Sequence, residues 1–307
     1  MSKVDLSVKL GHLRLKNPIL TASGTFGYGL EFAPFGDLAS LGGIVVKGLS
    51  LKPRQGNPCP RIVETPCGML NAIGLQNIGV EAFLKDKLPY LPWSKTSIWV
   101  NLYAQTKEEF AELSSILAQE PGIAGLEVNI SCPNVKQGGV LFGQSPRMAA
   151  QVTEAVKKKS KDKFVLVKLS PNVTDIKEIA KAVVDAGADG ISLINTLGGM
   201  AVDIYCKRPK LKNVFGGLSG PAIKPVALKM VYEVARCVDL PIIGIGGISR
   251  VEDVLEFILV GAWAVQVGSA NFTNPSLVFE MVKELPQLMH RLGIKSLDEW
   301  RNSLILE

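Results

Sequence analysis

Residues 126–134 read Leu-Glu-Val-Asn-Ile-Ser-Cys-Pro-Asn and place a cysteine directly behind an expected strand. Apolar and polar residues alternate from Leu126 to Ser131, which is typical of a β-strand. Pro133 lacks the amide hydrogen that extends a strand, so Cys132 lies at a strand end. The glycine-rich segment that follows, up to Pro146, is long enough to move as a lid. In a barrel of eight parallel strands, reactive groups gather at such strand ends, and the pattern therefore predicts chemistry at Cys132.

The same pattern of a short apolar strand followed by a helix recurs along the chain. Strands are predicted near Ile19, Ile44, Ile98, Leu126, Val165, Ile191, Ile242 and Val265, and helices at 80–91, 107–117, 148–159, 176–186, 221–238 and 251–260. Eight strands with intervening helices predict an α/β fold, a single (β/α)8 TIM barrel. Alternation over residues 4–15 around Gly11 predicts an N-terminal β-hairpin that closes the bottom of the barrel. A doubly wound open sheet is the alternative, but no Gly-x-Gly-x-x-Gly sequence opens a helix after the first strand.

The composition of the 307 residues is that of a globular chain, with 47% hydrophobic and 20% charged residues. Because barrels of this length form one unit, residues 1–307 are predicted to be a single domain. The excess of 34 basic over 28 acidic residues gives a net charge of +6, which favours anionic ligands. The densest basic run, 157–161, ends a predicted helix and has no interleaved aromatic residue, so nucleic acid is not expected as a partner.

No hydrophobic signal-peptide core and no apolar segment of membrane-spanning length is visible, which predicts a cytoplasmic protein without a membrane partner. Five cysteines occur without a Cys-x-x-Cys pair, and the chain has two histidines. The cysteines fit neither a disulfide framework nor a metal cluster, so we expect reduced thiols and no bound metal.

Polar groups follow most of the predicted strands, and glycines follow the last two. The strand-end set consists of Ser23, Lys47, Asn101, Asn129, Cys132, Lys168, Asn195 and Thr196. The pairs Gly246-Gly247 and Gly268-Ser269 offer bare backbone amides to an anion, as barrels do after strands seven and eight. A phosphate cradle beside a lysine and amides would accept flavin mononucleotide (FMN), whose reduced ring is anionic and is stabilised by a lysine. Aldolase-type and isomerase barrels use the same groups, so residue types alone leave several chemistries open.

Two long connections separate these strands. Residues 71–77 in the first, Asn-Ala-Ile-Gly-Leu-Gln-Asn, combine amides with a glycine and suit a small polar ligand, although an ordinary turn has a similar composition. The second connection, 197–219, is expected to help build a site, since structureless loops of this length are uncommon in compact domains.

Eight motifs are spread in order along nearly the whole chain. They are Ala-Ser-Gly-Thr-Phe-Gly-Tyr-Gly (22–29), Val-Lys-Gly (46–48), Asn-Ala-Ile-Gly-Leu-Gln-Asn (71–77), Asn-Ile-Ser-Cys-Pro-Asn (129–134), Ile-Asn-Thr (194–196), Gly-Gly-Leu-Ser-Gly-Pro (216–221), Gly-Ile-Gly-Gly-Ile (244–248) and Gln-Val-Gly-Ser-Ala (266–270). Together they resemble the class 1 dihydroorotate dehydrogenases. The first and third motifs are most similar to the catalytic subunit of the NAD-linked class 1B enzyme. The fumarate-using class 1A is less similar, and the membrane-bound class 2 would have serine in place of Cys132.

This resemblance implies oxidation of (S)-dihydroorotate to orotate in de novo pyrimidine (UMP) biosynthesis, with FMN held in this chain. Cys132 would be the base that removes the C5 proton while a hydride leaves C6 for the flavin. The residues implied around the flavin are Ser23, Lys47, Gly48, Asn101, Asn129, Lys168, Ile194, Gly220, Gly246, Gly247, Gly268 and Ser269. Those implied to hold the substrate are Lys47, Asn71, Ala72, Ile73, Gly74, Leu75, Asn129, Asn134, Asn195 and Thr196.

The sequence shows no second dinucleotide fingerprint and no cysteine cluster for iron and sulfur, so electrons are expected to leave through another component. The resemblance implies a partner subunit with flavin adenine dinucleotide (FAD) and a 2Fe-2S cluster, NAD as final acceptor, and a homodimer core within a heterotetramer. The alternatives are a class 1A-like dimer that uses fumarate, a dihydrouridine-synthase-like flavin barrel acting on RNA, and a flavin-free lyase or isomerase. A non-catalytic binding protein ranks last because it would not need a lysine, a thiol and a phosphate cradle on one face.

Overall fold

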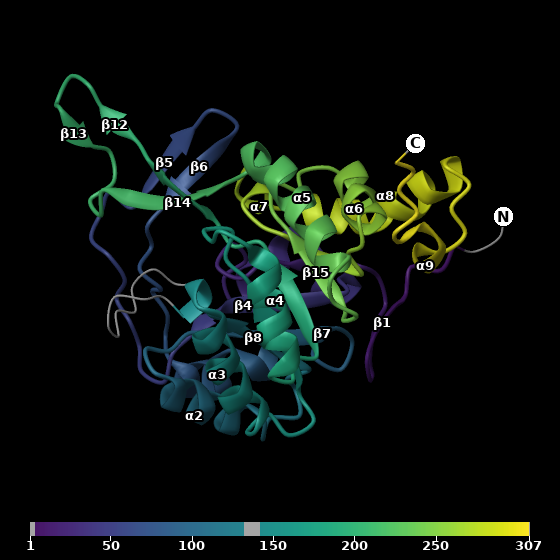
Figure 1. Cartoon of the computed structure of the whole chain (residues 1–307), viewed down its shortest axis with the longest axis horizontal. Helices are drawn as coiled ribbons and strands as arrows, with labels where there is room; N and C mark the ends of the chain where they lie inside the picture. Colours follow the sequence, from purple (N-terminus) through teal and green to yellow (C-terminus); the bar gives the residue numbers. More distant parts are fainter. Residues whose placement is uncertain (1–3, 132–141, 307) are drawn as a thin grey trace.

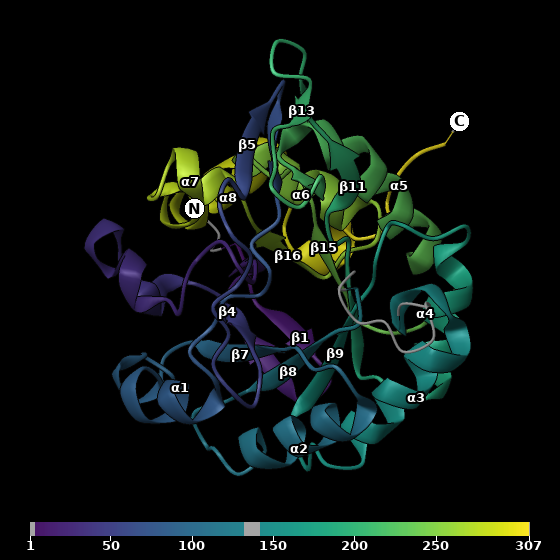
Figure 2. The same cartoon turned by 90° about the vertical axis from the view of Figure 1, so that its left-hand side faces the viewer.

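Eight parallel strands close into a barrel in the computed structural model, which describes residues 4–131 and 142–306. In barrel order they are β10 (Gly190–Leu193), β15 (Ile242–Ile245), β16 (Ala264–Val267), β3 (Ile19–Thr21), β4 (Gly43–Leu49), β7 (Ser97–Leu102), β8 (Gly125–Asn129) and β9 (Phe164–Lys168). Each predicted strand is among them, so the predicted (β/α)8 barrel is confirmed and the open sheet is wrong. Figure 2 shows the helices arranged around the strands.

Within the described residues, the first six helices overlap the six predicted ranges, with ends that differ by up to five residues, and the last three helices were not predicted. The helices are α1 (Val80–Asp86), α2 (Lys107–Leu117), α3 (Pro146–Lys157), α4 (Ile176–Asp185), α5 (Lys224–Ala235), α6 (Val251–Leu259), α7 (Ala270–Thr273), α8 (Leu277–Arg291) and α9 (Leu297–Trp300). The bounds of α2 agree because Thr106 accepts a hydrogen bond from the Glu109 amide at 3.1 Å and caps the first turn. The prediction for 80–91 is wrong beyond Asp86, where a 3-10 turn takes over, since Pro89 has no amide hydrogen to continue the α pattern.

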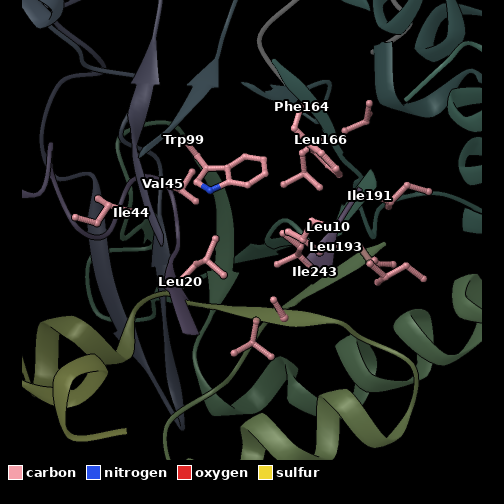
Figure 3. Close-up of a cluster of buried hydrophobic side chains, with 14 of the residues drawn as sticks. Leu10, Leu20, Ile44, Val45, Trp99, Phe164, Leu166, Ile191, Leu193 and Ile243 are labelled. Carbon is pink, nitrogen blue, oxygen red and sulfur yellow. The ribbon is translucent and has the colours of Figure 1, made fainter. Parts of the chain in front are cut away.

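Large apolar side chains fill the barrel interior, where Figure 3 shows Trp99, Leu166 and Leu20 pointing toward one another. Trp99 and Phe164 are fully buried and pack edge to face, with ring centroids 5.5 Å apart. A Cβ at Gly125 would lie 2.3 Å from a carbon of the Trp99 ring, so the indole occupies the space that glycine leaves. This packed layer closes the interior, and ligands are therefore restricted to the strand ends.

The predicted N-terminal hairpin is present as β1 (Val8–Leu10) paired antiparallel with β2 (Leu13–Leu15). A Cβ at Gly11, in its turn, would lie 3.5 Å from the ring of Phe164, the first residue of β9. Leu10 is fully buried and belongs to the cluster in Figure 3. The hairpin therefore lies against the N-terminal ends of the barrel strands, as predicted.

A second, antiparallel sheet is built from the two long connections. Its strands, in order, are β11 (Leu197–Met200), β14 (Phe215–Ser219), β6 (Gly68–Asn71) and β5 (Ile62–Thr65). A short hairpin of β12 (Val202–Asp203) and β13 (Arg208–Pro209) extends from it, and Figure 1 shows these strands projecting from one side of the molecule. Because the two connections follow β4 and β10, this sheet stands at the C-terminal ends of the barrel strands. The sequence predicted none of its strands.

Candidate active site

Four of the predicted site residues lie on neighbouring strands at one end of the barrel. Lys47 is in β4, Asn101 in β7, Asn129 in β8 and Lys168 in β9, and these strands follow one another in barrel order. Asn129 stands opposite Lys168 in the register of β8 and β9. All four lie in the C-terminal half of their strands, which is the end where β/α barrels carry their sites.

Lys47 lies where the pairing of β4 with β7 is interrupted. The pairs are regular up to Val46 and resume at Leu49, and the Lys47 amide instead donates to the Gly27 carbonyl at 2.9 Å. This bond attaches the loop 22–29, which carries the half-buried Ser23, to the end of β4. Burial, and to a lesser degree the charge of Arg61, hold the pKa of Lys47 below its ordinary value of 10.5. A bound anion would stabilise this ammonium.

A fully buried carboxylate that the sequence did not predict, Glu127, connects the polar residues of the barrel interior. It accepts hydrogen bonds from Asn101 Nδ2 at 2.6 Å, Ser192 Oγ at 2.9 Å and Gln266 Nε2 at 2.8 Å. Lys168 Nζ lies 3.6 Å from Glu127 Oε2. The signal was present in the sequence, because the two-residue period of a strand places Glu127 on the same face as Asn129, one pair deeper in the barrel.

Asn101 presents an acceptor without a partner. The residue is 1% exposed, its Nδ2 is bonded to Glu127, and its Oδ1 has no hydrogen-bond partner among the described residues. A Cβ at Gly48 would lie 2.8 Å from this Oδ1, so any side chain at position 48 would crowd the acceptor. Since an unpaired buried acceptor is unfavourable, a ligand N–H group would stabilise this site.

The predicted anion cradle lies after β15 and β16. Gly246 and Gly247 have φ angles of 131° and 72°, a conformation that favours glycine. A Cβ at Gly246 would lie 2.8 Å from Ala227 Cβ, and one at Gly247 would lie 2.7 Å from Lys224 Cβ, because the start of α5 packs against this turn. A Cβ at Gly268 would lie 3.6 Å from Ala22 Cβ, which is an ordinary van der Waals contact. The bare amides of these glycines suit a phosphate group.

Of the other predicted flavin residues, Ile194 and Ser269 border this cradle, and Gly220 lies at the second sheet. The Ile194 amide donates to the Ile245 carbonyl at 2.9 Å, which places Ile194 beside Gly246. Gly220 has a φ of 103°, and a Cβ there would lie 2.6 Å from Gly68 Cα, so the turn after β14 packs closely against β6. Ser269 precedes the first residue of α7.

Of the predicted substrate residues, the structure joins one group by hydrogen bonds and places another at the second sheet, where Asn71 donates to the carbonyl of Gly217, a neighbour of Thr196. Asn195 Nδ2 donates to Asn129 Oδ1 at 3.3 Å, and the Thr196 amide donates to Asn195 Oδ1 at 2.9 Å. Residues 71–75 lie at the end of β6 instead, where Asn57 binds the carbonyls of Ala72 and Ile73, each at 2.9 Å. Within the described residues, no hydrogen bond or ion pair joins residues 71–75 to Lys47 or Asn129.

Two predicted residues, Cys132 and Asn134, and most of the segment predicted to be a lid lie outside the described residues. The last described residue before them is Ser131, whose Oγ donates to the Lys168 carbonyl at 2.9 Å. Over residues 4–131 and 142–306, no group of three His, Cys, Asp or Glu side chains is placed to hold a metal ion. Across the same ranges, none of the helices is long and apolar enough to span a membrane.

A closed β/α barrel whose C-terminal strand ends carry lysines, clustered amides and a glycine cradle defines a class of barrel proteins that offer cations and bare amides to an anionic ligand. The family model described as dihydroorotate dehydrogenase matches residues 5–289, so the chain belongs to the dihydroorotate dehydrogenase family and the resemblance seen in the sequence is confirmed.

Three close relatives of the chain bear the name dihydroorotate dehydrogenase B (NAD(+)), catalytic subunit. The protein of that name from Solidesulfovibrio magneticus is 66% identical over 98% of both chains. The one from Maridesulfovibrio salexigens is 60% identical over 99% of both chains. A third, from Geotalea uraniireducens, is 56% identical over 99% of this chain and 100% of its own length.

Proposed function

We propose that this chain is the FMN-binding catalytic subunit of an NAD-linked dihydroorotate dehydrogenase. It oxidises (S)-dihydroorotate to orotate in de novo pyrimidine (UMP) biosynthesis. The observation that carries the proposal is that relatives bearing this enzyme's name match 98–99% of the chain at 56–66% identity. The strand-end lysines and amides of the barrel support the same chemistry, since they offer positive charge and hydrogen bonds to an anionic ring substrate.

Three features of the chain fit FMN. The glycine cradle after β15 and β16 suits its phosphate. The Oδ1 of Asn101, which has no partner among the described residues, suits an N–H group of its ring, and the Lys168 ammonium favours negative charge on that ring. We propose that FMN is held by Ser23, Lys47, Gly48, Asn101, Asn129, Lys168, Ile194, Gly220, Gly246, Gly247, Gly268 and Ser269. When bound, FMN supplies the acceptor for the hydride that leaves the substrate.

The chain's own side chains would bind the substrate and move its proton. Lys47 would pair with the anionic charge of dihydroorotate, and the hydrogen-bonded amides of Asn129 and Asn195 would orient its ring. Thr196, Asn134 and residues 71–75 complete the proposed substrate site. Cys132 would take the proton from C5. Because a free thiol has a pKa of about 8.5, we expect turnover to rise with pH.

We also propose a partner subunit that carries FAD and a 2Fe-2S cluster and passes electrons to NAD. It would surround a central homodimer of chains like this one, in a cytoplasmic heterotetramer. The words "NAD(+)" and "catalytic subunit" in the relatives' name support this arrangement over a dimer that uses fumarate.

The test compares the purified chain alone with the chain and its partner subunit. The isolated chain should show the absorbance of bound flavin at about 450 nm, lose that absorbance when dihydroorotate is added, and reduce NAD negligibly. The reconstituted complex should reduce NAD rapidly. Rapid NAD or fumarate turnover by the isolated chain would contradict the assigned electron route, and a colourless chain that cannot be loaded with FMN would contradict the proposed cofactor.

A further inference from the structure

We propose that Glu127 is a positioning residue of the flavin site. It orients the Asn101 amide so that its oxygen faces the ligand as an acceptor, and it holds the Lys168 ammonium beside the ligand. The inference rests on the proposed function and goes beyond it, because Glu127 is not among the residues proposed to touch flavin or substrate. It acts through the two residues that do.

The geometry of the carboxylate carries the proposal. Glu127 is fully buried on β8, and its hydrogen-bond donors come from β7, β10 and β16, while Lys168 approaches from β9. A buried carboxylate is stable only when it is hydrogen-bonded and paired with a positive charge, and Glu127 has both. The side chain is therefore held in one position by partners from four other strands of the barrel.

Glu127 determines which way the Asn101 amide points. An ionised carboxylate can only accept hydrogen bonds, so the Nδ2 group of Asn101 must face it, at 2.6 Å. The Oδ1 of the same amide then faces away, beside Gly48, and has no partner among the described residues. A neutral amide at position 127 would remove this requirement, because glutamine can turn either its carbonyl oxygen or its NH2 group toward Asn101.

Glu127 also sets the charge beside Lys168. At 3.6 Å the ammonium lies outside hydrogen-bond distance of the carboxylate but within ion-pair distance. The lysine therefore stays paired, while its N–H groups make no hydrogen bond to any of the described residues. The net charge of the pair is zero, so removing the carboxylate would leave an uncompensated positive charge next to the ligand.

The test is the midpoint reduction potential of the flavin-loaded Glu127→Gln variant at neutral pH. Loss of the negative charge should favour reduced flavin about tenfold, which is a rise of ~30 mV for a two-electron couple. In a Lys168→Met background the same substitution should shift the potential at least threefold less, because a buried carboxylate that loses its paired ammonium is neutralised by a proton, and glutamine then removes no charge. Ser114→Ala is the matched control, because the buried Ser114 hydroxyl bonds the Val156 carbonyl between α2 and α3, outside the network, and its potential should equal that of the wild type.

A Glu127→Gln protein with full flavin and an unchanged potential overturns the inference, as does an equal shift with and without Lys168. If Glu127→Gln does not fold, Glu127→Asp keeps the charge but withdraws it by one methylene, and it should bind FMN at least tenfold more weakly. Wild-type FMN affinity in Glu127→Asp would also overturn the inference. A wild-type chain that holds no flavin refutes the proposed function and this inference together, whereas the variant results refute the inference alone.

Discussion

Replacing Gly247 with alanine tests whether the turn after β15 is shaped for a ligand by close packing against α5. Gly247 has a φ of 72°, and a Cβ there would lie 2.7 Å from Lys224 Cβ, 2.8 Å from its amide nitrogen and 2.9 Å from its Cα. Two of these atoms belong to the backbone. Lys224 is further held by ion pairs with Asp253 at 2.7 Å and Glu256 at 2.9 Å, so it cannot move aside without breaking other contacts.

The chain contains a control that separates backbone strain from the clash. Gly293 has a φ of 71°, almost the same as Gly247, but no described atom lies within 4 Å of its missing Cβ. Gly293→Ala should therefore be destabilised only by the strain of a left-handed backbone, which costs about 1–2 kcal/mol of stability. Gly247→Ala should be destabilised by the same strain and, in addition, by overpacking against Lys224, which costs about 1–3 kcal/mol. The expected total for Gly247→Ala is roughly 2–5 kcal/mol.

The assay is thermal unfolding of both variants without added flavin, at one scan rate, so that ligand binding does not contribute to the difference. At roughly 2–4 °C per kcal/mol for domains somewhat smaller than this one, Gly247→Ala should melt several degrees below Gly293→Ala. Titration with FMN should show weakened binding for Gly247→Ala and unchanged binding for Gly293→Ala. Equal melting temperatures, or wild-type FMN affinity in Gly247→Ala, would refute the reasoning.

Three further predictions concern the chemistry. Cys132→Ala should retain flavin and bind orotate but slow flavin reduction on the order of 10²-fold or more, and stopped-flow reduction at the wild-type rate would exclude Cys132 as the base. Lys168→Ala should lower the flavin reduction potential, because an ammonium that favours the reduced ring is lost, and an unchanged potential at full occupancy would show that the contact is wrongly assigned. Orotate affinity should fall as pH rises, starting below the ordinary lysine pKa of 10.5, because the pKa of Lys47 is lowered and only its charged form pairs with the anion. In Lys47→Met this part of the pH dependence should be absent from the titration.

The barrel was predictable because its strands are buried on both faces and therefore read as short apolar runs. β4 and β9, for example, consist almost entirely of buried residues. The second sheet was missed for the opposite reason. β14 reads Phe-Gly-Gly-Leu-Ser with no buried residue, and β5 alternates between exposed and half-buried positions. Such strands are held together by backbone hydrogen bonds between two connections that are distant in the sequence. A local pattern of apolar residues therefore does not predict them.

The same limit applies to the site. Lys47, Asn101, Asn129 and Lys168 were found because each ends an apolar strand, and the structure places them on four adjacent strands. Glu127 was not predicted as a site residue, because a charged residue that alternates with apolar ones is typical of the solvent-exposed face of a strand. In a closed barrel the second face is the interior, and a carboxylate is stable there only because β7, β9, β10 and β16 supply its partners. That environment depends on tertiary pairing, which the strand's own sequence does not contain.

The most direct test of the central claim is anaerobic mixing of the purified chain with dihydroorotate in a stopped-flow spectrometer. The absorbance near about 450 nm should bleach in a single turnover, with one orotate formed for each flavin reduced and no NAD or partner subunit present. A flavin that stays oxidised in the presence of saturating dihydroorotate would contradict the account.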